Sequence, residues 1–519
     1  MSEQSEEVTI IGGGLAGLTA ALHLAERGLR PLILESDPNF PGGRVKGGEF
    51  CEVAGRKFRL EHGIHGIWAP YRNLQAMLTR RKIRPVWVPA QEECWIFRRG
   101  DVLNRANVGS AIRRSPIPAP FHYLNLFFRL DFLSALGIAD LLSLVAVWSG
   151  LLYAIGVDPL KEAQPLEGMR LSDILKGWSP ALRAFFIGLT RSGLAARPEE
   201  IPISGYIAFM RFYTVMRRDS WAFSYMPADA GSSLIDPLTA EIQKAGGRLR
   251  MGAKAVRIEQ NQAGWSVTCE SQLPDNPALQ ETFHTRHLIL ATDAPASRQL
   301  LLSGPATTDK ASKMAWPRGM ENAIIRIWFD KTPNPGAEAG IFSGDFILDN
   351  YFWLDRIQDQ YIEWRRETGG SAIEAHIYGP PELLAEPDSL LLSRAINDVN
   401  SAFPELRGSR IHQSIQRNPP VHTLFALGRP DQHLGIRTPW HNLYCCGDWI
   451  RHPAPCLFLE RATLTGIEAA NAVLEACQLP TWSLIPYLPP EPFAGWIENL
   501  MVRGRKARRQ RPQEEQNHV

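Results

Sequence analysis

The stretch Val8-Thr9-Ile10-Ile11-Gly12-Gly13-Gly14-Leu15-Ala16-Gly17 decides the fold class of this chain. An apolar strand runs here into the pattern Gly-x-Gly-x-x-Gly, and a second apolar strand, residues 31–34, ends at Glu35. In such a βαβ unit Gly12 permits a tight turn, Gly14 lets the backbone approach a pyrophosphate, and Gly17 packs helix on strand. The helix N-terminus faces the phosphates, and Glu35 can accept hydrogen bonds from a ribose hydroxyl. The stretch therefore predicts a dinucleotide site in an α/β fold.

Three further stretches are expected to extend the dinucleotide site. Pro41-Gly42-Gly43-Arg44 and Glu61-His62-Gly63-Ile64-His65-Gly66 bring glycines, which let backbone amides come close to a bulky cofactor. Arg44 can neutralise phosphate charge. Far downstream, Leu443-Tyr444-Cys445-Cys446-Gly447-Asp448-Trp449 is an apolar strand that ends in a carboxylate. A carboxylate at this place suits the ribityl and pyrophosphate region of an extended cofactor such as FAD.

Together these motifs resemble the FAD-dependent amine oxidase and phytoene desaturase superfamily over about residues 8–474. The chain is most similar to carotenoid desaturases of plant and cyanobacterial type and to carotenoid ring desaturase/methyltransferases of the isorenieratene synthase type. Gly63-Ile64-His65-Gly66-Ile67-Trp68-Ala69-Pro70-Tyr71-Arg72-Asn73 matches the Gly-Leu-His stretch of the desaturases, which ends in Tyr and Asn. Their Ala-Gly-Asp-Tyr and Met-Glu-Gly-Ala-x-x-Ser-Gly correspond to Cys446-Gly447-Asp448-Trp449 and Leu459-Glu460-Arg461-Ala462-Thr463-Leu464-Thr465-Gly466. Glu-Arg-Ala and Thr-Gly depart toward the ring-modifying enzymes, which leaves the reaction open but not the cofactor.

The resemblance implies FAD as the cofactor and assigns its contacts residue by residue. The pyrophosphate loop would comprise Gly12, Gly13, Gly14, Ala16 and Gly17. Glu35 and Ser36 would hold the adenosine ribose, and Arg44 the phosphates. The flavin side would be lined by Gly63, His65, Gly66 and Tyr71, and adenine would meet the backbone of Ala255 or, one residue on, Val256. Asp448 and the backbone of Leu459 would close over the far end of FAD.

The resemblance also implies a discontinuous domain organisation. We expect a Rossmann-like FAD-binding domain from residues 1–75, 225–300 and 425–478, and a mixed α+β substrate-binding domain from residues 76–224 and 301–424. Residues 462–474 indicate a helix that packs under the flavin. Ile324-Ile325-Arg326-Ile327-Trp328-Phe329 predicts an alternating strand in a sheet that roofs the flavin. Residues 479–519 form a C-terminal amphipathic segment with a basic tail.

Composition narrows the class of protein. The chain has 519 residues, 45% of them hydrophobic, and a net charge of +2, which indicates two or three globular domains and argues against a nucleic-acid binder. None of the seven cysteines forms a CxxC pair, and no Cys/His cluster has metal-ligand spacing, so we expect free thiols in a reducing compartment and no metal. Residues 1–7 fit neither a signal nor a transit peptide. We therefore expect the protein on the cytoplasmic side, peripheral to a bacterial membrane.

The first segment of the expected substrate-binding domain, residues 76–224, points to an apolar substrate. Residues 141–157 contain no charge and follow the aromatic run of residues 121–128, which favours a buried or membrane-dipping helix over a full span. We expect hydride transfer from a long apolar isoprenoid or carotenoid to flavin, in desaturation or in a linked isomerisation or ring modification. The chain shows one dinucleotide fingerprint, so quinone or oxygen is the expected electron acceptor rather than NAD(P)H. No catalytic residue can be assigned; Leu457, Phe458 and Leu459 would border the flavin, with Glu460 a weak candidate proton acceptor.

Two other functions stay open at this point. A flavin amine oxidase would need an aromatic cage, to which Trp449 or Tyr71 could contribute, and a non-catalytic flavin- or carotenoid-binding protein would show no turnover. At the C-terminus an apolar helical face precedes a basic run, and it indicates either a helix packed on its own domain or an anchor on a membrane surface. The face comprises Phe493, Trp496, Ile497, Leu500 and Met501, and the run comprises Arg503, Arg505, Lys506, Arg508, Arg509 and Arg511.

Overall fold

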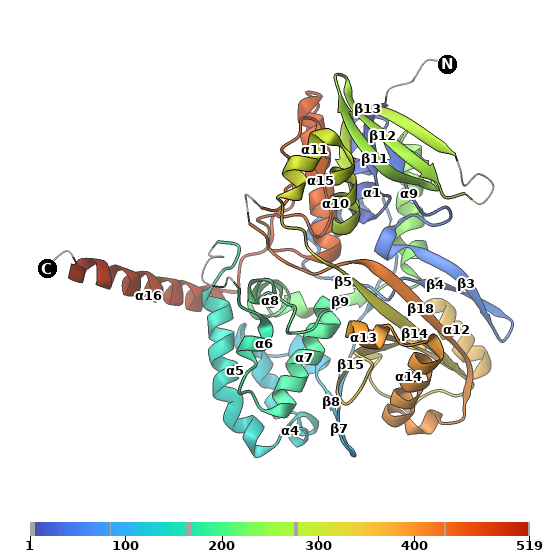
Figure 1. The fold of residues 1–519 in the computed structure, drawn as a ribbon. Coiled ribbons are helices and arrows are strands. Elements are labelled where there is room, and N and C mark those ends of the chain that lie inside the picture. Colours follow the sequence, from blue (N-terminus) through green and yellow to red (C-terminus); the bar gives the residue numbers. More distant parts are fainter. Residues whose placement is uncertain are drawn as a thin grey trace.

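Two seven-stranded sheets organise the chain. The computed structural model describes residues 6–83, 85–161, 166, 168–273, 279–429 and 432–516, and of residues 506–516 it describes the backbone only. One sheet lies in the upper part of Figure 1 and the other in the lower right, with a group of helices at the lower left.

The first sheet has the strand order β10-β2-β1-β13-β12-β11, and β19 pairs with β13. Neighbours from β10 to β13 run parallel, as does β19, whereas β12 and β11 are antiparallel. This largely parallel sheet confirms the predicted α/β class. Its strands come from three separate segments, as the predicted discontinuous domain requires: β1 Glu6–Ile11, β2 Leu32–Leu34, β10 Arg248–Arg250, β11 Ala253–Asn261, β12 Gly264–Ser271, β13 Gln280–Leu290 and β19 Leu443–Cys445.

Helices α1 (Leu15–Ala25) and α15 (Phe458–Ala476) pack against each other on this sheet. Every residue of α1 is buried, including Thr19 and His23, because α15 and α9 (Asp236–Lys244) cover the sides that the strands leave free. The helix expected over residues 462–474 begins at Phe458, four residues earlier. The outer helices are α10 Ala294–Ser303 and α11 Pro305–Ser312.

The second sheet has the order β18-β14-β17-β16-β15-β7-β8. The expected alternation at residues 324–329 is wrong, because this part of β14 is buried on both faces. Helix α14 (Asp388–Ala402) packs on one face, and Phe58 with α12 (Asp359–Thr368) packs on the other. The strands are β7 Glu93–Arg99, β8 Val102–Asn107, β14 Gly319–Phe329, β15 Ala339–Gly344, β16 Asn350–Trp353, β17 Ser371–Ile377 and β18 Arg410–Thr423.

The lower left of Figure 1 is helical, and α16 (Pro492–Gln516) projects from it past the end of α5 (Ile138–Gly156). Within the described residues, α5 is the one helix whose length and apolarity would suffice to cross a membrane. Two small sheets, β3-β4 and β5-β9-β6, connect the layers. The remaining elements are α2 Arg72–Arg80, α3 Gly109–Arg113, α4 Leu130–Ser134, α6 Leu171–Ile174, α7 Pro180–Leu194, α8 Ile203–Met210, α13 Pro381–Leu384, β3 Gly47–Val53, β4 Arg56–Glu61, β5 Gly66–Trp68, β6 Val88–Pro89 and β9 Phe223–Tyr225.

Candidate functional site

The glycine loop between β1 and α1 is shaped to admit an anion. Gly12 has a φ of +106°, and a Cβ on Gly17 would lie 2.1 Å from the carbonyl oxygen of Gly12, so both positions require glycine. A Cβ on Gly14 would meet no atom within 4 Å, because it would point into open space. Helix α1 starts directly after Gly14 and has no side-chain cap, so its first N–H groups stay free for a phosphate. The loop fits the pyrophosphate of FAD.

Glu35 is held at the end of β2 by donors of the protein. Its carboxylate accepts from the N–H groups of Gly13 and Asp37, both at 2.8 Å, and from the Ser36 hydroxyl at 3.2 Å. The carboxylate of a ribose-binding acid must be fixed in this way before it can orient a hydroxyl. Ser36 therefore touches Glu35 itself, next to the predicted ribose position.

The predicted adenine contact lies beside Glu35. The N–H of Ala253 donates to the carbonyl oxygen of Glu35 at 2.8 Å, which brings the start of β11 alongside. The pairing of β11 with β12 slips between Ala255 and Arg257, and this bulge leaves Val256 without a partner in the ladder. An unpaired backbone here is what a contact with adenine through the main chain needs.

Arg44 and Asp448 form an ion pair at 2.5 Å, although 404 residues separate them. Burial opposes charge on both groups, yet the attraction between them wins: the pKa of Asp448 lies below its usual value and that of Arg44 above. The resemblance had placed Arg44 on the phosphates and Asp448 on the far end of FAD. The ion pair brings these two predicted contacts side by side.

The N-terminus of α15 is uncapped and strained. The N-cap residue of this helix is Leu457, whose side chain cannot accept a hydrogen bond. The N–H groups of the first turn, which include that of Leu459, are therefore free to meet an anionic or polar ligand. Phe458 has a φ of +51°, a costly conformation for an aromatic residue. The buried Arg461 fixes the preceding loop, because its guanidinium donates to the carbonyl oxygens of Ile450, Ala454 and Cys456 at 2.7–3.2 Å.

The carboxylate of Glu460, a weak candidate proton acceptor, is fully engaged by neighbouring donors, which favours a structural role. Its carboxylate accepts from the N–H groups of Asn73 and Leu74 at 2.9 and 3.0 Å, and from the Tyr487 hydroxyl at 2.9 Å. These contacts cap the first turn of α2 from a different helix. Its position in the first turn of α15 was expected, but its partners were not.

Three neutral imidazoles gather around Arg44. Burial lowers the pKa of His65 and of His422 to about 4, and that of His62 falls well below its usual value. After burial, the positive charge of Arg44 also lowers the pKa of each of these three histidines. Tyr71 lies deeper, 1% exposed, with its hydroxyl 2.7 Å from that of Tyr213. Direct contact of Tyr71 with flavin stays a prediction.

No aromatic cage is built by the two residues considered for it. The indole N–H of Trp449 donates to the carbonyl oxygen of Thr292 at 2.9 Å, in a core that it shares with β19. Tyr71 belongs to a different core, on the other side of the first sheet. No group of three or more His, Cys, Asp or Glu in the described part of the chain is arranged to hold a metal ion.

Sequence reasoning missed a buried polar network behind the segment Glu61–His65. Arg326 of β14 pairs with Glu374 of β17 at 2.7 Å, and each side chain is 1% exposed. Burial and the charge of Glu374 raise the pKa of Glu61, whose carboxyl accepts from Ala230 and Gln358. The available signal was a single charge inside each of two largely apolar runs, residues 323–329 and 371–377, since such a charge must find a buried partner.

Comparison with known proteins identifies the relatives of this site. The model of the family described as flavin containing amine oxidoreductase matches residues 15–474. A carotenoid phi-ring synthase of Streptomyces griseus is 25% identical, with coverage of 90% of this chain and 87% of the relative. A probable zeta-carotene desaturase of Synechococcus elongatus is 23% identical, over 90% of this chain and 98% of that relative. Among solved structures, cyclohexylamine oxidase from Brevibacterium oxydans superposes with a TM-score of 0.63 at 16% identity, covering 92% and 100% of the two chains.

Proposed function

This chain belongs to the flavin-containing amine oxidoreductase family, and from that premise we propose that it oxidises a long apolar carotenoid. FAD is its cofactor, and the protein is an FAD-dependent oxidoreductase. When bound, FAD supplies a two-electron acceptor that can take a hydride from carbon. The names of two relatives, a phi-ring synthase and a zeta-carotene desaturase, support the substrate class.

An apolar cavity between α5, α7 and α8 carries the proposal. None of the described residues that line it is charged, so a protonated amine would lose its hydration there without gaining a partner. A polyene carries no charge that must be dehydrated, and it gains contact with aromatic and aliphatic side chains. The proposal therefore ranks a carotenoid above an amine. The aromatic lining includes Tyr123, Phe127, Trp148, Trp178, Phe185 and Tyr206.

The lining of the cavity is linked through one turn of helix to an aromatic ring that packs on the start of α15. Met210 lines it at the end of α8, and the chain continues as one turn of π-helix to Tyr213. The Tyr213 ring stacks on Phe458 with 6.2 Å between ring centroids, at the strained start of α15. A substrate that extended from the cavity along these aromatic rings would reach the groove of Arg44 and Asp448.

Anaerobic flavin bleaching separates the candidate substrates. Purified holoprotein is mixed with a carotenoid or with an amine, and the flavin absorbance near 450 nm is followed without oxygen. We expect bleaching by the polyene and none by the amine, with product chromatography to tell desaturation from isomerisation or ring modification. Bleaching by the amine alone would contradict the proposal. Readmission of oxygen or a quinone to the bleached protein then identifies the electron acceptor, for which we propose one of these two.

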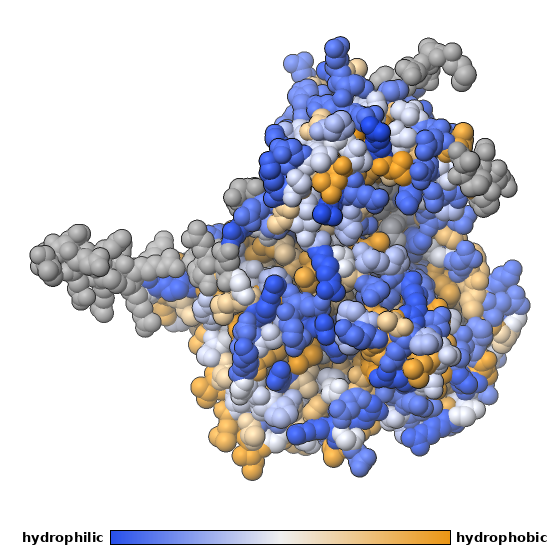
Figure 2. All heavy atoms as spheres, viewed as in Figure 1, coloured by the Kyte–Doolittle hydropathy of each residue, from blue (hydrophilic) through white to orange (hydrophobic). Residues whose placement is uncertain are grey.

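We also propose that the enzyme sits on the cytoplasmic surface of a membrane, peripheral to it. Hydrophobic side chains gather along the lower left edge of Figure 2, over α4 and α5. Leu142 and Val145 on the outer face of α5 are 74% and 77% exposed, and the inner face of the same helix lines the apolar cavity. An exposed apolar face of this kind marks a contact site, and here a lipid-dissolved substrate would have one helix to pass.

The apolar face predicted for α16 is partly buried and partly exposed. Ile497 is buried and Met501 packs on Gly156 of α5, whereas Phe493, Trp496 and Leu500 are exposed. The side chains of the basic run from Lys506 onward lie outside the described residues. α16 is thus both packed on its own domain and free to add apolar contact beside α5.

Co-sedimentation with anionic liposomes tests this orientation. The full chain with Leu142→Glu and Val145→Glu, or with Trp496→Glu and Leu500→Glu, should pellet less than the unchanged protein, since charge is costly in the bilayer interface. Leu390→Glu on α14, an exposed apolar residue on another part of the molecule, is the control. Equal binding of all four proteins would contradict the proposed surface.

A further inference from the structure

The segment between β4 and β5 is held from behind through its backbone. The carbonyl oxygen of Glu61 accepts from Arg326 at 2.5 Å, and that of His62 accepts from Asn418 at 2.9 Å. The N–H of Ile64 donates to Glu374 at 2.8 Å. Gly63, with a φ of +143°, makes the turn between them. Three consecutive contacts of this kind fix both the position and the orientation of residues 61–65.

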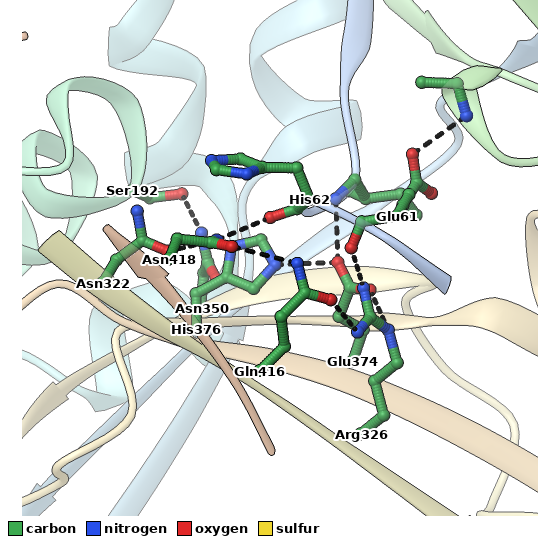
Figure 3. Close-up of polar contacts among 12 residues, drawn as sticks. Glu61, His62, Ser192, Asn322, Arg326, Asn350, Glu374, His376, Gln416 and Asn418 are labelled. Atoms are coloured by element: carbon green, nitrogen blue, oxygen red, sulfur yellow. Dashed lines mark hydrogen bonds and ion pairs between the residues drawn. The ribbon is translucent and has the colours of Figure 1, made fainter. Parts of the chain in front are cut away.

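The three holding side chains belong to one network on the second sheet. Figure 3 shows Arg326, Glu374 and Gln416 pointing from the strands toward the segment that carries Glu61 and His62. Gln416 accepts from Arg326 at 3.2 Å and donates to Asn418 at 2.9 Å. Asn418 donates in turn to Asn322 at 2.8 Å, and His376 completes the shell of Glu374 at 2.8 Å. Because every member has a partner, the network is rigid.

The stability of the fold does not by itself explain why the ion pair of Arg326 and Glu374 is buried here. The strand neighbours of Arg326 and Glu374, which are Ile325, Ile327, Ile373 and Ala375, are fully buried in the core on the other face of the sheet. Replacing a buried ion pair by apolar side chains of similar volume is often neutral or even stabilising, because the pair must be desolvated. Such pairs can instead specify one conformation. Here the conformation that they specify is that of residues 61–65.

The start of the segment lies beside the turn that carries Arg44. Glu61 pairs with Gly47 in the β3–β4 ladder, and Gly42 of that turn bridges to Gly14 of the glycine loop. Burial, together with the charge of Arg44, lowers the pKa of His62 and of His65. The segment thus connects the buried network with the turn whose Arg44 pairs with Asp448. We propose that Glu374, Arg326 and Asn418 are positioning residues of the flavin site, which act through the backbone of residues 61–65. This inference depends on FAD and not on the identity of the substrate.

Glu374→Gln in the FAD-loaded, full-length protein is the first test. The amide can still accept from Ile64, but Arg326 loses its counter-ion, so the segment should shift. We expect a changed visible circular dichroism spectrum of the bound flavin and an FAD dissociation constant raised about tenfold. Asp355→Asn is the matched control: Asp355 is a buried carboxylate that contacts the same strand β17, accepts from Ala372 at 3.1 Å and pairs with Arg365 at 3.3 Å. It should lower the melting temperature without a change in the flavin spectrum.

Two further variants keep the test decisive if Glu374→Gln fails to fold. Asn418→Ala removes the contact with His62 without a change of charge, and it should alter the flavin spectrum in a folded protein. The double variant Arg326→Met, Glu374→Leu leaves no unpaired buried charge, so it should be less destabilised than either single loss and still show the altered spectrum. A native flavin spectrum and native FAD affinity in these folded variants would overturn the inference and leave the network a purely structural role.

Discussion

Glu460→Ala tests the reassignment of this residue from chemistry to structure. The change removes the acceptor for the buried N–H groups of Asn73 and Leu74 and for the Tyr487 hydroxyl. An unsatisfied buried donor costs about 1–3 kcal/mol, so loss of two backbone partners should destabilise the protein by roughly 2–6 kcal/mol. Glu460→Gln retains one acceptor oxygen and should cost about 1–3 kcal/mol.

The measurement is thermal unfolding of the holoprotein, followed by far-UV circular dichroism and by the fluorescence of released FAD. Glu468→Ala is the control on the same helix, because Glu468 is 30% exposed and has a single partner, His452 at 2.8 Å. It should cost less than about 1 kcal/mol. Unchanged stability of Glu460→Ala would refute the capping role. Full stability of Glu460→Gln together with complete loss of turnover would restore Glu460 as a proton acceptor.

Three other predictions concern the cofactor and pH. Gly14→Val should give folded but colourless protein, because its Cβ meets nothing in the protein and only the pyrophosphate would collide with the side chain; Gly17→Val should fail to fold, and yellow Gly14→Val would contradict the site. Asp448→Ala should leave Arg44 unpaired and weaken FAD retention by about 1–3 kcal/mol, measured as the FAD dissociation rate. Burial lowers the pKa of His122 to about 4, so between pH 6.5 and 4 the unfolded chain binds a proton that the folded chain does not. As the pH is lowered through this range, the unfolding free energy therefore decreases by about 1.4 kcal/mol per pH unit. His122→Leu should reduce the loss of melting temperature between pH 7 and pH 5, and an unchanged loss would contradict this.

Local pattern was enough to predict the first wall of the cofactor groove. Gly12, Gly14 and Gly17 act through their own backbone and their nearest neighbours, and Glu35 ends the adjacent strand, so a stretch of about thirty residues contains the whole argument. The same holds for the apolar helix α5, since the lack of charge over residues 141–157 is visible in the sequence without knowledge of its partners.

Contacts between residues far apart in the chain determine the features that the sequence did not predict. Glu460 looked like an ordinary first-turn acid, and only the approach of α2 shows that its carboxylate caps another helix. Arg326 appeared to be the polar residue of an alternating strand, whereas the packing of α12 and α14 buries it and forces it onto Glu374. Periodicity records which face is apolar, but it does not record what covers the other face.

The strand order of the first sheet has a consequence for how the protein is made. β1 pairs with β13 and lies one strand from β19, so the sheet joins residues near 10, 290 and 445. The two walls of the groove, at Gly12–Gly17 and at Asp448–Leu459, therefore come together after nearly the whole chain has left the ribosome. Until β13 is made, the edge of β1 away from β2 is unpaired and open to misassembly. If FAD contacts both predicted sides of its site, it joins at the end of synthesis and stabilises the finished fold by its binding.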